Sequence, residues 1–555
     1  MTVFIGGAWP YANGSLHLGH IAALLPGDII ARYYRLKGER VLYVSGSDCN
    51  GTPIGIRAAQ EGIKVEEVAD RYHEEFVRSF LSLGFSYDEY TRTDHPYHHE
   101  EVQRIFTTLH EQGWLYEKEV EQVYCLNDQR FLPDRFVEGT CPVCGARARG
   151  DQCDHCSTVL DPTDLLNGIC KICGAEPVLK TTTHLYFALS KLQQPLEKLI
   201  KEKKGKWRDN AVQLTRRYLK EGLKDRPVTR DLENGVEVPI EGFRDKKIYV
   251  WIEAVCGYLS ASKKWAGEGK ESLNEFWDND TLSYYIHGKD NIPFHTIIWP
   301  AVLLGMNEAN HLPDHIVSNE YLTLEKRKIS TSQNWAVWVK DLLSDYHPDT
   351  IRYFLTINAP EKRDADFSWR EFIYSHNSEL LGAFGNLVQR TVKFYKKEFG
   401  DNLILTKVDE RVKQKVEEVF SSVGHCIESA RTRQGLEEVF EFIRWCNKRF
   451  DEQKPWVIVK ENREEGKRVL EEYIYIISNL RNILEPFIPF TASKVEEQLG
   501  MTHQPLWESV SLPLKLTVEN TLPLFNRIEL ESIDREREKL NEKFKGERNE
   551  NRHCF

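Results

Sequence analysis

The 555-residue sequence contains no hydrophobic run that approaches the ~20 residues needed to cross a bilayer. Its first residues, MTVFIGGAWPYANG, have no basic segment followed by a long apolar one, so they lack the pattern of a secretory signal. These two absences argue against a membrane protein and against a secreted one. We therefore expect a cytoplasmic location.

Three common catalytic signatures are also missing. The sequence has no GxxxxGK[ST] loop, no GxSxG turn and no HExxH helix. These motifs usually mark P-loop ATPases, serine hydrolases and zinc peptidases, so all three classes are disfavoured.

Positive charge is scarce overall, because 74 Lys and Arg residues face 85 Asp and Glu residues, for a net charge of -11. Indiscriminate nucleic-acid binding depends on neutralising phosphates, so we expect no DNA binding. The balance reverses between Pro195 and Arg230, where twelve basic residues against five acidic ones give a net +7. This basic segment is either a solvated helix face or a site for a specific RNA.

The order of apolar segments predicts an α/β fold. Residues 3–7 and 40–48 have the pattern of buried strands, with a helical pattern at 15–36 between them. Strand, helix and strand at this spacing begin a parallel sheet, whose ligands bind at the carboxyl ends of the strands. Sheet-like sequence resumes at 246–259, continues through 283–305 and reaches 316–324. We therefore expect one Rossmann-like parallel sheet that is split by an insertion.

Apolar residues from about 349 to 495 recur at helical spacing, which predicts a helical bundle. The last ~25 residues are charged and predict a solvated tail or a terminal helix. A chain this long holds several domains. The expected units are a first catalytic half at 1–114, a connective insertion at 115–230, a second catalytic half at 231–325, a loop and stem-contact junction at 326–370, a bundle at 371–530 and the charged tail at 531–555.

Two short stretches have the residue types that hold ATP phosphates. In HLGH, His17 and His20 are three residues apart, so they share one face of a helix, and Gly19 lets a ligand approach the backbone. The N-terminus of a helix adds free N–H groups that attract phosphate. In KISTS, Lys328, Ser330 and Thr331 offer one cation and two hydroxyls, with Lys326 and Arg327 just before them. Together they indicate adenylate-forming chemistry.

The cysteines give the strongest local pattern. CPVC and CDHC match the spacing of a closed, structural four-cysteine zinc site made by Cys141, Cys144, Cys153 and Cys156. The later pair, Cys170 and Cys173, needs upstream partners. A second zinc held by these two residues with Cys125 and Asp128 is a further hypothesis.

With these elements in this order, the chain resembles the class I aminoacyl-tRNA synthetases, and within them the methionyl-tRNA synthetase family. The matching stretches cover nearly the whole length. They are AWPYANGSLHLGH, GSDCNGTP, RFLPDRFVEGTCPVC, YVWIEAVCGY, HGKDNIPFH, GNLVQR and DEQKPW.

The resemblance implies activation of L-methionine with ATP and Mg²⁺, followed by transfer to tRNA(Met), the initiator tRNA included. His17, His20 and Lys328 would be catalytic, and Gly19, Gly288, Asp290, Lys328, Ser330 and Thr331 would bind ATP. Asp48 would pair with the α-ammonium group of methionine. The rest of the methionine pocket would be Ala8, Trp9, Tyr11, Trp251, Ala254, Tyr258, Phe294 and His295. The resemblance further implies an all-α domain that reads the anticodon through Asn386, Arg390 and Trp456. We expect a monomer.

The sequence also departs from the family pattern. The second phosphate loop is usually KMSKS, yet Thr331 stands where the second lysine is common. This leaves open a catalytically weak paralogue that only binds tRNA. Another class I synthetase, for leucine, isoleucine, valine or cysteine, is a second alternative. The insertion is too short for the editing domain of the first three. A cysteine enzyme would normally hold a catalytic-site zinc at the sheet rim, and the sequence has no such cluster there.

Overall fold

A computed structural model describes residues 1–132, 136–153, 155–156, 158, 160–267, 272–278, 280–307, 311–502 and 504–550. Residues 551–555 of the predicted tail lie outside this range. None of the helices in the described part of the chain has the length and apolar character needed to cross a bilayer.

A five-stranded parallel sheet forms the core of the two expected catalytic halves, as predicted. Its strand order is β14-β13-β1-β2-β3, with β1 at Thr2–Gly7, β2 at Arg40–Ser47, β3 at Glu89–Arg92, β13 at Leu282–Gly288 and β14 at His315–Asn319. The chain order reverses between β1 and β13. The carboxyl ends of these two strands therefore border the crevice where ligands of such sheets bind.

Both faces of this sheet are covered, and alternate residues of β1 serve the two sides. Val3 and Ile5 join the core that includes helix α1 (Leu18–Leu36), whereas Phe4 joins the core that includes α4 (Pro96–Glu111) and α8 (Gly257–Gly267). This alternation follows from the two-residue repeat of a strand. The other helices of the first half are α2 (Thr52–Glu61) and α3 (Val65–Ser82).

The sheet-like interpretation of 246–259 and 283–305 is wrong over most of its length. The first segment contains only a two-residue strand, β12 (Lys247–Ile248), followed by α7 (Val250–Glu253), a 3-10 turn η4 (Ala254–Cys256) and α8. The second leaves β13 at Gly288 and continues as η5 (Lys289–Asn291), the π-helical turn η6 (Phe294–Ile298) and α10 (Trp299–Met306). These helices are buried almost all round, so their sequences lack the one-sided apolar pattern that distinguishes a helix from a buried strand.

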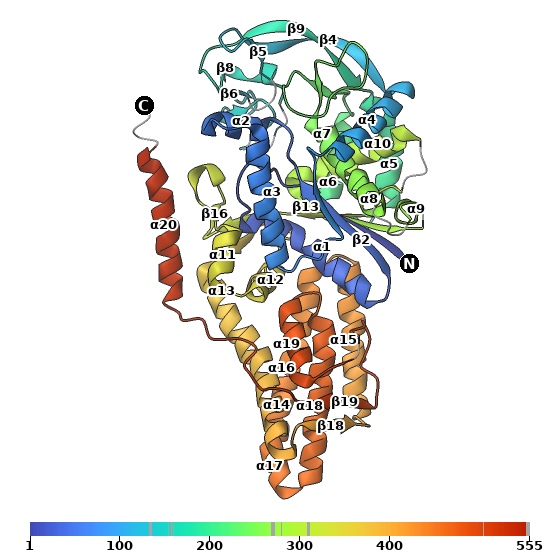
Figure 1. The fold of residues 1–555 in the computed structure, drawn as a ribbon, viewed down its shortest axis with the longest axis vertical. Helices are drawn as coiled ribbons and strands as arrows, with labels where there is room; N and C mark the ends of the chain where they lie inside the picture. Colours follow the sequence, from blue (N-terminus) through green and yellow to red (C-terminus); the bar gives the residue numbers. More distant parts are fainter. Residues whose placement is uncertain are drawn as a thin grey trace.

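The insertion forms its own layer beside the sheet (Figure 1). Its long antiparallel pair is β4 (Leu115–Cys125) and β9 (Val178–Phe187), extended by β5 (Arg130–Phe131) and β10 (Arg226–Pro227). A small second sheet holds β6 (Val137–Thr140), β7 (Arg147–Arg149) and β8 (Leu166–Cys170). The insertion also contains the turns η2 (Pro162–Asp164) and η3 (Leu189–Leu192), the helices α5 (Gln193–Glu202) and α6 (Asp209–Glu221) and the strand β11 (Thr229–Arg230). Helix α9 (Asn274–Trp277) follows later in the chain, before β13.

A junction follows β14. Strands β15 (Leu322–Leu324), β16 (Arg327–Lys328) and β17 (Ala365–Phe367) form a small sheet, accompanied by η7 (Thr331–Gln333), α11 (Val339–Asp345) and α12 (Pro348–Ile357). Arg352 of α12 is fully buried and donates to Asp28 of α1 at 2.7 Å and to the carbonyl of Pro486 at 2.9 Å. One guanidinium therefore ties α1 to the segment that enters the bundle helix α19 (Pro489–Leu499).

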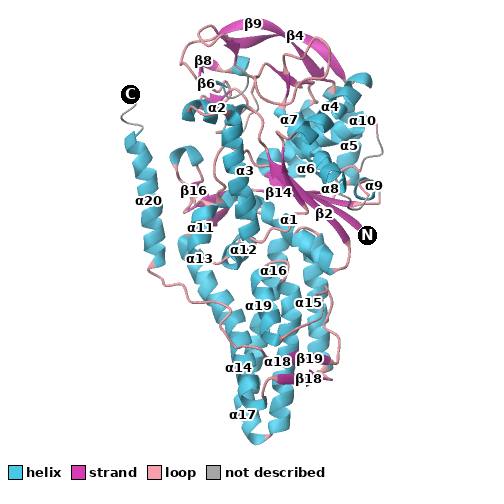
Figure 2. Ribbon diagram, in the orientation of Figure 1, coloured by secondary structure: helices cyan, strands magenta, loops and turns pink. Residues whose placement is uncertain are grey.

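The predicted helical bundle is present and extends away from the sheet (Figure 2). Its helices are α13 (Trp369–Ser375), which continues through η8 (His376–Gly385) into α14 (Asn386–Phe399), then α15 (Glu410–Glu428), α16 (Thr432–Gln453), α17 (Pro455–Glu461), α18 (Arg463–Leu484) and α19 (Pro489–Leu499). Strands β18 (Asn402–Leu405) and β19 (Leu514–Thr517) pair beside it. The chain then returns toward the end of the bundle nearer the sheet and forms helix α20 (Ser532–Glu550), one of the two predicted forms of the tail (Figure 1).

Candidate active site

The HLGH stretch forms the start of α1, and its two imidazoles support that start. His17 is the N-cap residue, so only His20 lies within the helix. The Nδ1 atom of His17 accepts from the backbone N–H of Gly19, and Nδ1 of His20 accepts from the backbone N–H of His17, both at 3.1 Å. The rings stack with their centroids 3.8 Å apart. The two histidines are brought together by a capping box rather than by a shared helix face.

These contacts fix the tautomer of both rings. Burial, and for His17 also the neighbouring His20 ring, lowers the pKa of each imidazole, that of His20 to about 4. Both rings are therefore neutral near pH 7. Because Nδ1 is the acceptor in each, the proton lies on Nε2. The start of α1 thus offers two neutral Nε2–H donors at the positive end of a helix dipole, which together favour a phosphate.

Gly19 brings the second phosphate stretch against the first. A Cβ atom at this position would lie 2.9 Å from Cε1 of His17 and 3.6 Å from Cδ1 of Ile329, the second residue of KISTS. Backbone bonds between Leu18 and Val337 and between Val339 and Leu16 hold the two segments side by side. Residues more than three hundred positions apart therefore meet at one site.

KISTS lies on an exposed hairpin. Strands β15 and β16 pair antiparallel, and the two turn residues Glu325 and Lys326 have φ values of 46° and 64°. Lys328 is exposed, and its Nζ lies 5.2 Å from the ring centre of Tyr321. The backbone of Ser330 pairs in both directions with Trp335, and Thr331 starts the turn η7.

Tyr321 connects this hairpin with the predicted nucleoside residues, and sequence reasoning missed it. Its hydroxyl donates to the carboxylate of Asp290, and the ammonium of Lys289 lies 3.8 Å from its ring centre. Gly288 ends β13, and a Cβ atom placed on it would meet no other atom within 4 Å. No signal in the sequence marks Tyr321, because it lies within residues 316–324, which have the pattern of an ordinary strand.

Trp9 and Asp48 lie at the carboxyl ends of β1 and β2. The Trp9 ring occupies the space that a side chain at Gly46 or Gly257 would need, since a Cβ at Gly257 would lie 2.7 Å from the ring. Ala8 is buried, while Tyr11 forms a parallel bridge with Asp48. The two glycines are therefore required by the bulk of the tryptophan, a reason that the sequence alone does not give.

Asp48 is a buried carboxyl with a second carboxyl close by. It accepts from the backbone N–H of Asn50 at 3.1 Å. Burial and the neighbouring Glu253 raise its pKa well above the usual range. Glu253, which sequence reasoning missed, contacts Asn50 at 3.1 Å and Nε2 of His98 at 2.6 Å, and burial raises its pKa to about 8. A cation bound beside these two buried carboxyl groups is therefore favourable, because it compensates the charge of their ionised form.

Tyr258 and His295 form the polar floor of the predicted pocket. The Tyr258 hydroxyl lies 2.7 Å from Nε2 of His295, whose Nδ1 lies 2.8 Å from the carbonyl of Asn291. Because a carbonyl only accepts, Nδ1 of His295 carries the proton and its Nε2 accepts from the tyrosine. Trp251 and Phe294 meet edge to face at 4.7 Å, and Phe294 belongs to the π-helical turn η6. Ala254 lies one helical turn after Val250, at the end of α7.

Two cysteine-rich clusters have the geometry of metal sites. In the first, the sulfur atoms of Cys141, Cys144, Cys153 and Cys156 all lie within 4.8 Å of one another, with pairs at 3.6 and 3.8 Å. Tetrahedral zinc with bonds of ~2.3 Å would place its sulfur ligands about 3.8 Å apart, so the donor set fits zinc.

The second cluster joins Cys125, Asp128, Cys170 and Cys173, again within 4.8 Å. Its CxxCG turn repeats that of the first cluster. Gly145 and Gly174 both have φ of 72° and donate to the carbonyls of Cys141 and Cys170. Among the described residues these are the two groups with metal-ligand geometry.

The three predicted anticodon residues gather on the bundle. Arg390 donates to Asp451 at 2.7 Å and to Asn447 at 2.8 Å, and its guanidinium lies 4.0 Å from the ring centre of Phe450. The same ring lies 6.2 Å from that of Trp456, whose side chain is 43% exposed. Asn386 is exposed one helical turn before Arg390. Figure 1 places α17, which carries Trp456, at the end of the bundle farthest from the sheet.

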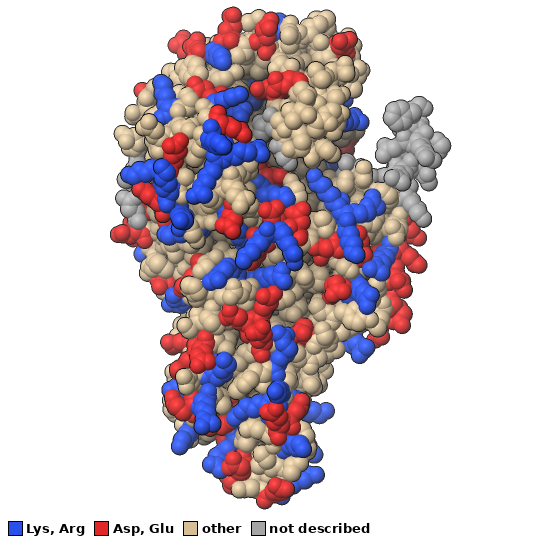
Figure 3. Space-filling view, turned by 180° about the vertical axis from the view of Figure 1, so that it is seen from behind, with Lys and Arg blue, Asp and Glu red and all other residues tan. Residues whose placement is uncertain are grey.

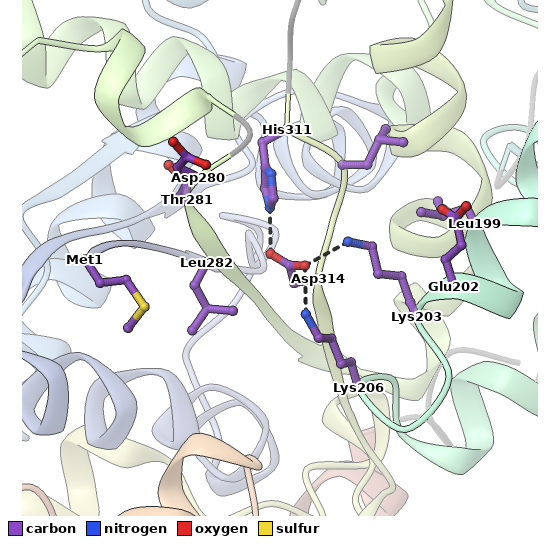
Figure 4. A pocket seen from close by; sticks show the side chains of 11 residues that line it. Met1, Leu199, Glu202, Lys203, Lys206, Asp280, Thr281, Leu282, His311 and Asp314 are labelled. Atoms are coloured by element: carbon purple, nitrogen blue, oxygen red, sulfur yellow. Dashed lines mark hydrogen bonds and ion pairs between the residues drawn. The ribbon is translucent and has the colours of Figure 1, made fainter.

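Part of the basic segment 195–230 forms ion pairs within the protein. Lys203 and Lys206 bind Asp314 at 2.7 and 3.2 Å in a surface pocket near Met1 (Figure 4). This pocket lies beside the amino ends of β13 and β14, opposite to the crevice. Seen from behind, basic side chains are interspersed with acidic ones (Figure 3).

Comparisons with known proteins agree with this arrangement. A family model described as tRNA synthetases class I (M) matches residues 3–392, and one described as the anticodon binding domain of methionyl tRNA ligase matches residues 402–549. Methionine–tRNA ligase from Bacillus mycoides strain KBAB4 is 58% identical over 542 residues, covering 97% of this chain and 99% of the relative. A protein named methionine–tRNA ligase 2 from Bacillus cereus is 57% identical, with the same coverage.

A solved structure shares the fold. Methionyl-tRNA synthetase from Mycobacterium tuberculosis bound by methionyl-adenylate matches with a TM-score of 0.79 at 22% identity, covering 95% of this chain and 100% of that one. The family models and the high identity of the relatives together show that this chain belongs to the methionyl-tRNA synthetase family of class I aminoacyl-tRNA synthetases.

Proposed function

We propose that this protein is a methionine–tRNA ligase, which forms methionyl-adenylate from L-methionine and ATP and then transfers methionine to the terminal adenosine of tRNA(Met). The observation that carries the proposal is the meeting of HLGH and KISTS, where Gly19 faces Ile329. The chain that makes this contact is 58% identical to a methionine–tRNA ligase over nearly the full length of both proteins.

In the first step, a carboxylate oxygen of methionine attacks the α-phosphorus of ATP. The bond from that phosphorus to the bridging oxygen of the β-phosphate breaks, and pyrophosphate leaves. Catalysis of such a transfer consists mainly of positioning and charge stabilisation. The Nε2–H groups of His17 and His20 donate to phosphate oxygens, and Lys328 neutralises the pyrophosphate end. Ser330 and Thr331 add hydroxyl donors, and Mg²⁺ bound to ATP supplies further positive charge.

The nucleoside end of ATP lies over Gly288 and Asp290. The open space around Gly288 leaves room for a planar base or a ribose. Asp290 is exposed and accepts from Tyr321, so its second oxygen is available to a ribose hydroxyl.

Methionine is selected by shape and by a few polar contacts, because its thioether offers little else. Asp48 pairs with the α-ammonium group. The side chain lies among Trp9, Trp251, Phe294 and Tyr258, with Ala8, Tyr11, Ala254 and His295 completing the wall. The Tyr258 hydroxyl points at His295 and orders the floor of this pocket before the ligand arrives.

A second candidate function, a tRNA-binding paralogue without catalysis, is motivated by Thr331. The decisive experiment is ATP–pyrophosphate exchange with each of the twenty amino acids. Exchange with methionine alone supports the proposal, and exchange with leucine, isoleucine, valine or cysteine instead would overturn it. No exchange combined with retained binding of tRNA(Met) would favour the paralogue.

Transfer requires recognition of the tRNA, which we assign to the far end of the bundle. In this proposal Asn386 and Arg390 bond an unpaired base and Trp456 stacks on one. Trp456→Ala should raise the KM for tRNA(Met) about tenfold in aminoacylation, given the usual cost of losing base stacking. Trp445→Ala is the matched control, since Trp445 is similarly exposed on α16. An unchanged KM in Trp456→Ala would remove this assignment.

Zinc, where bound, stabilises the insertion, and both cysteine clusters fit a closed structural site. Metal analysis of the purified chain should give two zinc ions per molecule. If the parent chain holds a single zinc ion and the variant Cys170→Ser still holds it, the second cluster binds no zinc.

A further inference from the structure

The exposed KISTS hairpin is held from outside by the terminal helix α20. This helix packs against the turn η7 within the loop and against α13. Two sets of side-chain contacts link α20 to the turn and to strand β16 of the hairpin, although 212 positions separate Arg537 of the helix from Glu325 of the turn.

The first contact is an ion pair at the hairpin turn. Arg537 of α20 donates through Nε and Nη2 to the two carboxylate oxygens of Glu325, at 3.2 and 3.0 Å. Glu325 Oε1 also accepts from the backbone N–H of Trp369 at 3.0 Å. One carboxylate in a left-handed turn thus joins the hairpin, the start of α13 and α20.

The second contact joins Arg327 to two aromatic rings. Its guanidinium lies 4.1 Å from the ring centre of Trp335 and 4.5 Å from that of Phe544 in α20. The two rings meet edge to face at 5.4 Å, and the Trp335 indole donates to the carbonyl of Leu324. A guanidinium within ~6 Å of an aromatic ring centre makes a favourable cation–π contact, and Arg327 makes two.

The contact of Arg327 with the two rings affects the proposed phosphate-binding residue Lys328, because both residues belong to the two-residue strand β16. Arg327 and Lys328 are consecutive in this strand, so their side chains point to opposite faces. With Arg327 held toward Phe544, Lys328 is directed to the other face, where Tyr321 and Asp290 lie. This arrangement separates the cations of the loop, since α20 engages Arg327 and leaves Lys328 on the ATP side.

We infer that Phe544 and Arg537 are positioning residues for ATP, and that α20 acts as a clasp that orients Lys328 by holding Arg327 and Glu325. The inference rests on the proposed function, because it assigns Lys328 to the pyrophosphate end of ATP. It assigns a role in nucleotide binding to a segment outside the catalytic sheet. It also accounts for how a loop with Thr331 keeps one cation in place for the phosphates.

Kinetics of ATP–pyrophosphate exchange in the full chain test this clasp. Phe544→Ala should raise the KM for ATP about fivefold, on the scale of a cation–π contact, with the KM for methionine within about twofold of the original. Phe544→Tyr, which keeps the ring, should restore the KM for ATP. Glu538→Ala, an exposed change on the same helix, is the control. No rise for ATP, or an equal rise for both substrates, would overturn the inference.

Hydrogen–deuterium exchange supplies a readout that does not depend on activity. Phe544→Ala and Arg537→Gln should each accelerate exchange in residues 322–335 and leave 17–22 unchanged. Equal exchange at 322–335 in the variants and the parent would overturn the clasp even if the enzyme is active. If the parent chain shows no methionine-dependent ATP–pyrophosphate exchange, the proposed function is refuted instead. The hydrogen–deuterium exchange result would then decide alone whether α20 holds the hairpin.

Discussion

The two phosphate stretches reach the same site by different means. HLGH supports itself, because each histidine ring accepts a backbone N–H of the same turn and the stretch opens a helix whose residues are largely buried. KISTS lies on an exposed hairpin, and its fixed contacts come from Trp335 and from α20 at the far end of the chain. The buried half of the site is therefore preformed, whereas the exposed half depends on outside support.

This difference separates two kinds of catalytic contribution. Groups in the buried half have perturbed pKa values and fixed tautomers, so we expect their loss to affect the transition state or methionine binding strongly. Groups on the hairpin are close to water, where a charge contributes less, so we expect smaller effects that concentrate on ATP.

The largest effect is expected for His20→Ala. Loss of a positioned N–H donor to the transition state commonly costs about 10²–10³-fold in rate. The variant also leaves the backbone N–H of His17 without its acceptor. Single-turnover formation of methionyl-adenylate measures the rate, with the exposed His425→Ala on the bundle as control. A reduction below about tenfold would show that the capped imidazole is structural only.

Asp48→Ala should raise the KM for methionine about a hundredfold, because it removes the buried partner of the ammonium group. The KM for ATP should change little, since the proposed partner of Asp48 is the ammonium group of methionine. Pyrophosphate exchange with each substrate varied in turn gives both constants. Equal increases would contradict the assignment of Asp48 to methionine.

A substitution on the exposed hairpin should have a smaller effect on catalysis than one at the start of α1. Lys328→Ala should raise the KM for ATP about tenfold, the scale of a hydrogen bond to a charged group, with little change for methionine. Lys326→Ala, at the solvent-exposed turn, is the matched control. If Lys328→Ala lowers the rate as much as His20→Ala, the hairpin contributes equally and the distinction between the two halves fails.

The pH dependence of methionine binding should distinguish the halves further. The raised pKa of Asp48 means that methionine must displace a proton below that pKa. The KM for methionine should then rise as pH falls, by at most about tenfold per unit, while the KM for ATP stays flat. Glu253→Gln removes the like charge, so the rise should move to lower pH. A KM for methionine that is constant from about pH 8 to 5.5 would contradict a protonated Asp48.

The sequence predicts the fold class, the bundle and both cysteine clusters, because these depend on local spacing. CxxCG turns, strand alternation and capped helix starts are all encoded within a few residues. The helices at 246–267 and 289–306 were not predicted, since a helix buried on all sides has the same apolar run as a buried strand.

Partners distant in sequence were also beyond prediction. Glu253 stood within a recognised motif, yet its contact with Asn50 and His98 arises only when β2, α4 and α7 converge. Tyr321 and Phe544 belong to none of the motifs recognised in the sequence. Their roles follow from the position of the hairpin between β13 and α20, which depends on the whole tertiary fold.

Hydrogen–deuterium exchange of the unaltered chain, with and without ATP, tests the distinction between the halves most directly. A preformed start of α1 predicts slow exchange at residues 17–22 that ATP barely changes, with a clear gain of protection at 322–335. Protection gained at 17–22 with none at 322–335 would contradict it, because the buried half would then be the one that ATP completes.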